Sequence, residues 1–405
     1  MNRLTKQIVL VLSILVMAYV AAGFVLQRSS EDKTYRSLTV YSEVLEHVQK
    51  DYVEDPDMHS VTVGALHGLL DSLDPNSSYL SPLEYKDYLD KTHRKVEANA
   101  GLAISKRNGY VIIISVLSDS PGQKAGLHAG DYLESIAGFT TSQMSIGQAQ
   151  VLLTGLPGSS VKLSVIRRTR VEPEEVEVVL AKPIEAKIIE DRLEGDIAYL
   201  RMTQLDAGAV GRLKDRLAEL NSKNVSKLIL DVRDCAVGFP EDGVAAAQLF
   251  LQAGNIASLK GQTVAAQTFS ADPAKVVWKQ PIVLIVSSGT AGAAEVLAGA
   301  LGDDHRGETV GDRTFGSAST QKVIQLDDGS ALILTVADYY TPSGKSIPTD
   351  GVVPTVPATS EDLATLNDQQ QITAPPPGQA ASPDDPLVKK AITILQGGTV
   401  NKKAA

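Results

Sequence analysis

The strongest constraint on the fold is an alternation of apolar stretches with helical patterns in the second half of the chain. The alternating segments are predicted strands at 196–202, 227–232 and 281–286 and predicted helices near 207–220, near 243–252 and at 291–301. Uninterrupted apolar strands belong to sheets that are covered on both faces, and their alternation with helices is typical of α/β folds. We therefore expect an α/β core between residues 184 and 358.

Two smaller regions precede this core. Apolar residues recur at helical spacing after residue 35, and a second helical pattern covers 61–73. The first pattern forms one stripe, made of Leu38, Val40, Tyr41, Val44, Leu45 and Val48. From Gly101 onward short β-rich runs alternate with turns, which favours a small strand-rich domain. The sequence thus predicts an N-terminal helical segment at 35–97 and a β-rich domain at 98–183.

The N-terminus carries an uncharged, mostly apolar run from Ile8 to Leu26. This length matches the ~20 residues with which a helix crosses a bilayer. Arg3 and Lys6 precede the run and acidic residues follow it, which by the positive-inside rule places the bulk of the chain outside the cytoplasm. We expect residues 1–30 to be a membrane anchor or signal segment of a single-pass, periplasmic protein. A cleaved signal peptide is the competing interpretation, although the run is long for one.

The composition changes again near the C-terminus. Residues 359–385 are polar and rich in proline, which is typical of a flexible linker. A short amphipathic pattern follows at 386–397, with its apolar residues on one face. We expect this helix to pack on the core of the same chain, and docking on a second subunit is the alternative.

Composition argues against several classes of function. The formal net charge of −10 comes without a clustered basic patch, so we expect no nucleic-acid partner. Cys235 is the single cysteine, and the sequence contains neither a CxxC pair nor an HExxH helix that could hold zinc. We therefore expect no metal and no cofactor.

The segment SPGQKAGLHAGDYLESIAG, residues 120–138, resembles the signature of PDZ domains. The resemblance implies strand addition, in which an extended peptide pairs with an exposed strand edge while its terminal carboxylate meets successive backbone N–H groups. Gly101, Leu102, Ala103 and Ile104 match the position of the carboxylate-binding loop. The alternative is that these four residues begin an ordinary β-strand.

Segments in order along nearly the whole chain after residue 30 resemble the carboxyl-terminal processing peptidases, also called tail-specific proteases. The segments are LDPNSSYL, the PDZ signature, YLRM, LILDVRD, TAGAAEVLAGAL, VGDRTFG, and YYTPSGKSI followed by GVVPTV. The resemblance implies an α/β peptidase core of the ClpP/crotonase-like type, with an inserted PDZ domain and an N-terminal helical segment. It also implies an exported or membrane-anchored serine peptidase that uses a Ser/Lys dyad on substrates captured by the PDZ domain.

The chain departs from this family at the positions that carry the chemistry. Gly292 stands where the family has its serine nucleophile, in T-A-G-A-A-E, and Ser317 stands where it has its lysine base. The loop that donates backbone N–H groups to the oxyanion carries Val237 and Gly238 in place of a glycine pair. If the first position of that pair must adopt positive φ, a β-branched valine there is strongly disfavoured.

Two hypotheses follow from these departures. The first is an inactive peptidase homologue that binds the C-terminal or unfolded segments of extracytoplasmic proteins, beside an active relative. The second is a serine-type endopeptidase that uses displaced residues. The candidates for displaced chemistry are Ser287, Ser288, Thr290, Ser317, Ser319, Cys235 and His305. Their simpler interpretations favour the first hypothesis, since Ser and Thr before a helix form turns and N-caps and a lone cysteine is usually a small buried hydrophobe.

Overall fold

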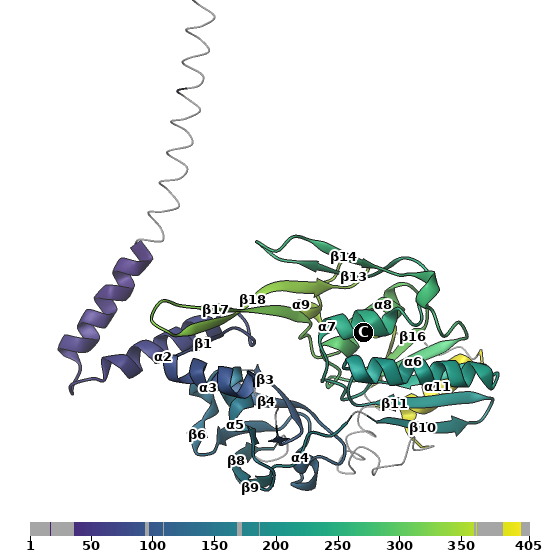
Figure 1. Cartoon of the computed structure of the whole chain (residues 1–405), viewed down its shortest axis with the longest axis horizontal. Coiled ribbons are helices and arrows are strands. Elements are labelled where there is room, and N and C mark those ends of the chain that lie inside the picture. Colours follow the sequence, from purple (N-terminus) through teal and green to yellow (C-terminus); the bar gives the residue numbers. More distant parts are fainter. Residues whose placement is uncertain are drawn as a thin grey trace, which may run out of the picture. The chain divides into compact units, whose positions relative to one another are not determined.

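The computed structural model describes residues 17, 36–93, 97–107, 109–167, 172–185, 187–359, 362 and 384–397. The chain divides into two compact units, Met1–Ala65 and Leu66–Ala405, and Figure 1 colours its elements along the sequence. The described part of the first unit is helical. It contains a helix at 36–51 and the first half of α2 (Met58–Asp71).

A six-stranded sheet forms the centre of the second unit. Its order is β10-β11-β12-β15-β16-β19, with bounds Ile188–Leu193, Ile197–Met202, Lys227–Asp231, Ile282–Val286, Glu308–Gly311 and Val356–Pro357. The strands from β11 to β19 run parallel, and β10 pairs antiparallel with β11. Parallel neighbours need crossover connections, which the helices of this region supply.

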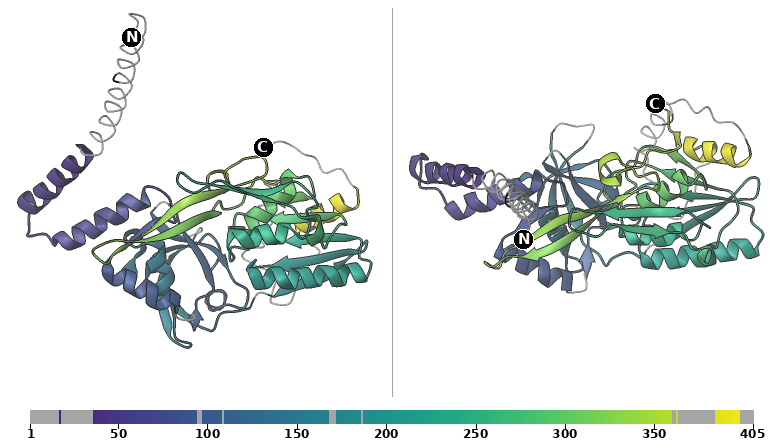
Figure 2. Two further views of the ribbon diagram at one scale, coloured as in Figure 1. Left: turned by 45° about the horizontal axis from the view of Figure 1, so that its top comes forward. Right: turned by 90° about the horizontal axis from the view of Figure 1, so that it is seen from above.

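Both faces of this sheet are covered, because successive residues of a strand point to opposite faces. Leu228 and Leu230 pack in a cluster with α6 (Ala207–Ser222), α7 (Pro240–Ala247) and α8 (Ala293–Asp303). Ile229, between them, packs in a second cluster with α11 (Pro386–Leu395). The right-hand view of Figure 2 shows this helix in yellow along the sheet. The mixed α/β architecture predicted from the sequence is confirmed.

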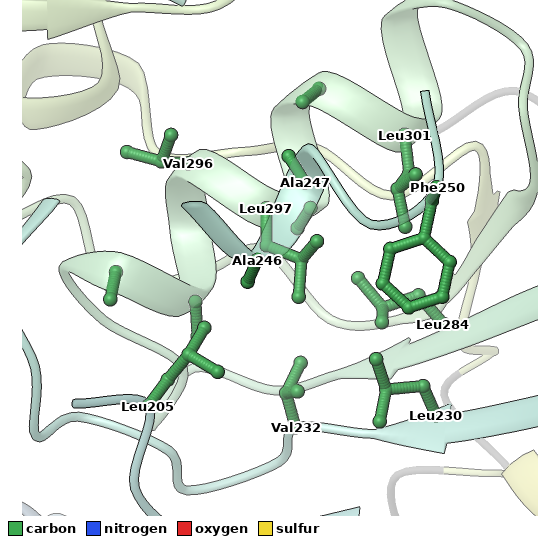
Figure 3. Packing of buried hydrophobic residues seen from close by; sticks show 14 of the residues in the cluster. Leu205, Leu230, Val232, Ala246, Ala247, Phe250, Leu284, Val296, Leu297 and Leu301 are labelled. Carbon is green, nitrogen blue, oxygen red and sulfur yellow. The ribbon is translucent and has the colours of Figure 1, made fainter. Parts of the chain in front are cut away.

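The larger of the two clusters brings α7 and α8 onto the sheet. Figure 3 shows side chains of the sheet and the loops beside it under those of the two helices and of Phe250, which follows α7. The lower side chains are Leu205, Leu230, Val232 and Leu284, and those of the helices are Ala246, Ala247, Val296, Leu297 and Leu301. Small residues on α7 and α8 let the two helices approach closely. A Cβ added at Gly243 of α7 would lie 2.1 Å from the carbonyl oxygen of Ala293. The start of α8 is therefore held against α7.

A second sheet extends beside the first. Its strands are β1 (Ser78–Leu80), β13 (Asn255–Lys260), β14 (Gln267–Ser270), β17 (Ser319–Gln325) and β18 (Ala331–Tyr340), in the order β1-β18-β13-β14 with β17 also paired to β18. The 3-10 helix η2 (Pro273–Lys275) and the short helix α9 (Ile347–Asp350) lie in its connections. Because β17 begins at Ser319, the pairing of β17 with β18 fixes the chain just after Ser317.

Along the chain, a β-rich region with its own core follows α3 (Pro82–His93) and precedes the first strand of the central sheet. Its strands are β3 (Leu102–Arg107), β4 (Tyr110–Val116), β5 (Tyr132–Ile136), β6 (Phe139–Thr140), β8 (Ser160–Ile166) and β9 (Glu174–Val179), with β2 (Ala98–Asn99) paired to β7 (Thr154–Gly155). The helices are α4 (Pro121–Lys124), the 3-10 helix η1 (Thr141–Gln143) and α5 (Ile146–Leu152). Residues such as Ile113, Leu133 and Leu163 are fully buried in a cluster of this region alone.

Several helix bounds differ from the sequence predictions. The structure begins α7 at Pro240 instead of near 243, because proline suits the first helical position and the carboxylate of Asp242 accepts from the Phe239 N–H at 3.0 Å. Similarly, α8 begins at Ala293 and α11 ends at Leu395. The bounds of α8 and α11 differ by two residues, as is common where capping decides the end. The start of α7 differs by three residues and its end, at Ala247 instead of near 252, by five.

The predicted single-pass membrane location is wrong as far as the described chain goes. No helix among the described residues is long and apolar enough to cross a bilayer. Even α6, with 16 residues, reaches only about 24 Å against the ~30 Å of a hydrocarbon core. The run from Ile8 to Leu26, on which the prediction rested, lies outside the described residues except for Met17. Apolar length alone did not suffice to establish the anchor.

Candidate functional site

The candidate site lies where the turn after β15 enters α8. Thr290 closes this turn, because its hydroxyl donates to the carbonyl oxygen of Val232 at 2.8 Å and accepts from the N–H of Ser287 at 2.9 Å. Gly292 follows with φ +59° and ψ −115°, in a region that residues with a side chain rarely adopt. Such strained backbone is typical of nucleophile positions, and glycine adopts it without steric cost.

Ser317 lies directly beside Gly292. The backbone N–H of Gly292 donates to the Oγ of Ser317 at 3.1 Å, so the two positions identified from the sequence meet in space. Ser317 is half-buried and follows Gly316, whose positive φ of 89° turns the chain toward α8. The backbone therefore brings positions 292 and 317 together, but the side chain is a hydrogen atom at Gly292 and a short alcohol at Ser317.

Glu295 is a residue of the candidate site that was not singled out from the sequence. Its fully buried carboxylate accepts hydrogen bonds from two hydroxyl groups, Thr314 Oγ1 at 2.5 Å and Ser317 Oγ at 3.5 Å. It also accepts from three backbone N–H groups, those of Gly316 at 2.6 Å, Ser317 at 2.8 Å and Gly292 at 3.0 Å. Burial raises the pKa of Glu295, and these hydrogen bonds act against that rise. A lone glutamate at the third position of an otherwise apolar helix was the available signal.

The loop before α7 brings a carbonyl oxygen to the site. The Gly238 carbonyl oxygen lies 3.2 Å from the place that a Cβ on Gly292 would take. Gly238 itself has φ +134°, and a Cβ there would lie 2.2 Å from the carbonyl oxygen of Leu205. Val237 is not among the residues with positive φ, so the strain expected at the valine is absent. Its carbonyl accepts from the Leu205 N–H at 2.7 Å.

The serine and threonine residues considered for displaced chemistry have hydrogen-bond partners other than lysine or histidine. Ser287 Oγ donates to Asp234 and accepts from the Asp234 N–H, each at 3.2 Å. Ser319 Oγ accepts from Asn76 and Gln321. The described hydrogen bonds of Ser287, Thr290, Ser317 and Ser319 involve no lysine and no histidine.

The other three candidates are no closer to a reactive arrangement. Cys235 is fully buried, and burial raises the pKa of its thiol well above the ordinary value, so it stays protonated. Ser288 and His305 are both exposed, and His305 lies on the loop beyond the far end of α8. In the part of the chain that the structure describes, no group of three His, Cys, Asp or Glu residues is placed to hold a metal.

The four residues matched to the PDZ carboxylate loop begin the edge strand β3. Gly101 has φ +69°, and a Cβ on it would lie 2.2 Å from the Cβ of Ser120, so the turn into β3 requires glycine. Leu102, Ala103 and Ile104 follow in β3, which is the last strand in the order β3-β4-β5-β8-β9. One edge of β3 pairs with β4, and the other edge has no partner among the described strands. Leu102 and Ile104 also pack on the core of this region.

This β-rich region contacts the candidate site directly. The guanidinium of Arg107, at the end of β3, lies 5.1 Å from the ring centre of Phe315. Phe315 stands between Thr314 and Gly316, which both donate to Glu295. A Cβ on Gly289 would lie 3.0 Å from the carbonyl oxygen of Ile114 in β4. The loop that holds Glu295 is therefore packed against the strand that offers its edge.

The sequence of this chain is similar to those of known proteins. Residues 196–358 match Peptidase family S41, and residues 112–167 match the PDZ domain. The chain is 32% identical over 333 residues to a carboxy-terminal-processing protease of Bartonella bacilliformis, covering 81% of this chain and 76% of that protein. It is 28% identical over 326 residues to carboxy-terminal processing protease CtpA of Bacillus subtilis, covering 79% and 69%.

A solved structure is similar over most of the length as well. The structure of a photosystem II D1 C-terminal processing protease aligns with a TM-score of 0.66 and 27% sequence identity. The alignment covers 78% of this chain and 86% of that one. The similarity therefore extends well beyond the residues around Gly292.

Proposed function

The chain belongs to peptidase family S41, among its carboxy-terminal processing proteases, and we propose that it binds protein C-termini without cleaving them. The family and the PDZ domain expected from the sequence are confirmed. The observation that carries the proposal is the contact between Gly292 and Ser317, the two residues that the sequence resemblance assigns to the family's serine and lysine positions. Gly292 has no side chain that could attack a substrate, and the hydroxyl of Ser317 has no lysine or histidine among its described hydrogen bonds to take its proton.

The size of the chemical loss supports an inactive homologue. A hydroxyl nucleophile works only when a neighbouring base takes its proton, and here both members are replaced. Removing the serine alone lowers kcat about a million-fold in a well-characterised serine protease. From a typical kcat of roughly 10 per second, that leaves on the order of one turnover per day.

The carbonyl of Gly238 adds an electrostatic argument. Acyl transfer needs hydrogen-bond donors aimed at the oxygen that becomes negatively charged. At this site the negative end of a carbonyl dipole is directed at the position of the nucleophile's side chain, 3.2 Å away. A negative charge that develops beside Gly292 would meet repulsion there.

Peptide capture is the activity that the remaining features support. The open edge of β3 can pair with an extended chain. The resemblance to PDZ domains assigns the loop for a terminal carboxylate to Gly101, Leu102, Ala103 and Ile104. We assign capture to a PDZ domain at 98–183 and the inactive site to a ClpP/crotonase-like core at 184–358. The ligands are C-terminal or unfolded segments of proteins, held alone or presented to an active relative.

Two peptides that differ only at the C-terminus test capture. One is an unstructured, apolar-ended peptide with a free carboxylate, and the other is its C-terminal amide. We expect the free acid to bind the purified chain at least tenfold more tightly in fluorescence anisotropy, and both peptides to keep their mass in overnight incubation. Equal affinity for acid and amide would contradict capture of C-termini.

The same incubation tests inactivity. The double variant Gly292→Ser with Ser317→Lys rebuilds the dyad, and cleavage by this variant alone supports the proposal. The competing endopeptidase would use Ser317, whose Oγ lies 3.5 Å from Glu295 Oε2. Cleavage by the unmodified chain that disappears in Ser317→Ala would establish that alternative. Cleavage that survives in Ser317→Ala would point to another of the displaced candidates or to a contaminating protease.

A further inference from the structure

A cavity of about 520 Å³ lies between α6, α7 and the segment around η2. The two helices lie side by side on one face of the central sheet (Figure 1). The apolar walls come from Val210 of α6, Val244 of α7, and Leu249, Val276 and Val277 in the loops that follow α7 and η2. We call this cavity the α6–α7 groove. None of its lining residues belongs to the candidate site or to β3.

The groove is open to solvent along its length. Of its eleven lining residues only Gln248 and Leu249 are buried, whereas Lys214, Ala245 and Lys275 are among the exposed ones. A small-molecule site encloses most of its ligand, about 70–90% of the ligand surface. The α6–α7 groove therefore suits one side chain of a longer polypeptide better than a free small molecule.

Gln248 gives the groove a polar position. Gln248 is only 7% exposed, and its amide nitrogen donates to the carbonyl oxygen of Asp272 at 3.1 Å. Its amide oxygen accepts no hydrogen bond among the described residues. A buried acceptor without a partner costs stability unless a donor is supplied from outside. An occupant with a donor group on an apolar body meets this need.

The charges at the rim of the groove favour an acidic occupant. The carboxylate of Glu241 already accepts from the Tyr339 hydroxyl at 2.7 Å. Lys214 makes no ion pair and no hydrogen bond among the described residues, and Lys275 reaches Asp272 only at 3.9 Å. The charge that lacks a close partner is therefore positive.

We propose that the α6–α7 groove docks an acidic segment of a partner protein through one tyrosine or tryptophan side chain. The ring packs against Val210 and Val244, its O–H or N–H donates to Gln248 Oε1, and acidic neighbours of the ring lie beside Lys214 and Lys275. Tyrosine and tryptophan are enriched at interfaces because one side chain supplies a large apolar surface and a polar end. This docking does not depend on peptide capture at β3.

Fluorescence anisotropy of the full chain with a labelled peptide tests the proposal. The peptide carries one tryptophan among acidic residues and is amidated at its C-terminus, so β3 cannot hold it as a free C-terminus. A matched peptide has alanine in place of the tryptophan. We expect the alanine peptide to bind about tenfold more weakly, because it lacks the anchor.

Three variants locate the binding site. Lys214→Glu reverses a charge at the rim, and Lys322→Glu makes the same change at an exposed position of β17 that does not line the groove. We expect only Lys214→Glu to weaken binding of the tryptophan peptide, by about fivefold. Gln248→Leu removes the acceptor and should weaken the tryptophan peptide about threefold or more. The same variant should leave a phenylalanine peptide unaffected, since phenylalanine has no donor to lose.

Four results would overturn the proposal. Equal binding of the tryptophan and alanine peptides, or no binding of either, excludes an aromatic anchor. No loss in Lys214→Glu, or the same loss in Lys322→Glu, means that the rim of the groove is not involved. Equal effects of Gln248→Leu on the tryptophan and phenylalanine peptides mean that the acceptor is not used. Indolepropionate that binds as tightly as the tryptophan peptide would make the groove a small-molecule site.

Discussion

Gly292 adopts a backbone conformation in which a side chain is costly. At φ +59°, a Cβ would also lie 3.2 Å from the Gly238 carbonyl oxygen. We expect Gly292→Ser and Gly292→Ala each to lower the free energy of unfolding by about 1–3 kcal/mol, measured by urea denaturation. Gly211→Ala is the control, because Gly211 lies inside α6 with no atom near its Cβ position, and it should raise stability by about 0.5–1 kcal/mol. A stabilising Gly292→Ser would show that the backbone here is not strained.

Glu295 gives a prediction with a defined pH dependence. Glu295→Gln puts amide hydrogens against N–H donors, and we expect it to lower the free energy of unfolding by about 2 kcal/mol or more. The pKa of Glu295 is raised in the folded chain, so its contribution is fully present below the unfolded value of about 4.5 and decreases as pH rises through the folded value. The variant should therefore lose more stability at pH 4 than at pH 7, in denaturant titrations at both values.

A second glutamate provides the control of opposite sign. The pKa of the exposed Glu219 is lowered to about 2 by hydrogen bonds to Arg216 and Lys223. Its contribution is present above the unfolded value and is lost as pH falls, so Glu219→Gln should show a small effect that shrinks toward acid pH. If the stability loss of Glu295→Gln also shrinks toward acid pH, as expected for Glu219→Gln, the pKa of Glu295 is not raised in the folded chain.

At the scale of elements, the C-terminal helix depends on one aspartate. Asp385 caps α11 by accepting from the N–H groups of Leu387 and Val388, and its other oxygen lies 2.7 Å from Arg233 Nη1. We expect Asp385→Ala to lower the free energy of unfolding by about 2–4 kcal/mol, because it removes both a cap and a buried ion-pair partner. Hydrogen exchange should show α11 losing protection first.

The neighbouring aspartate is the matched control for that prediction. Asp384 makes an exposed ion pair with Lys389 at 3.1 Å, which is worth about 0.5 kcal/mol or less. Asp384→Ala should therefore leave the protection of α11 unchanged. Similar losses in the two variants would mean that apolar packing and not Asp385 holds the helix.

Elements were predictable where an uninterrupted apolar stretch or a period of 3.6 residues is sustained, and their ends were not. The stretch at 281–286 and its helix follow from apolar patterns alone, whereas the start of α7 depended on Pro240 and Asp242. In the same way Gly292 and Ser317 could be identified from motif positions in the sequence. The role of Glu295 and the direction of the Gly238 carbonyl could not be predicted in this way. Both depend on the positive φ values of Gly238, Gly292 and Gly316, which no sequence pattern reports.

For the whole molecule, the separate cores predict separate unfolding. The β-rich region has its own buried cluster, while the two clusters of the peptidase core lie on opposite faces of one sheet and should unfold together. Leu133 and Leu230 are both fully buried, one in each region. We expect replacement of either leucine by alanine to lower the free energy of unfolding by about 2–5 kcal/mol, and only for the region that loses the side chain.

The chain contains one tryptophan, Trp278, and it is buried in the peptidase core, so its fluorescence reports on that core alone. Far-UV circular dichroism reports on both regions. We expect Leu133→Ala to split the thermal transition seen by circular dichroism and to leave the fluorescence midpoint unchanged, whereas Leu230→Ala lowers the fluorescence midpoint. A single transition that moves equally in both variants and both signals would mean that the Arg107–Phe315 contact and its neighbours couple the regions into one cooperative unit.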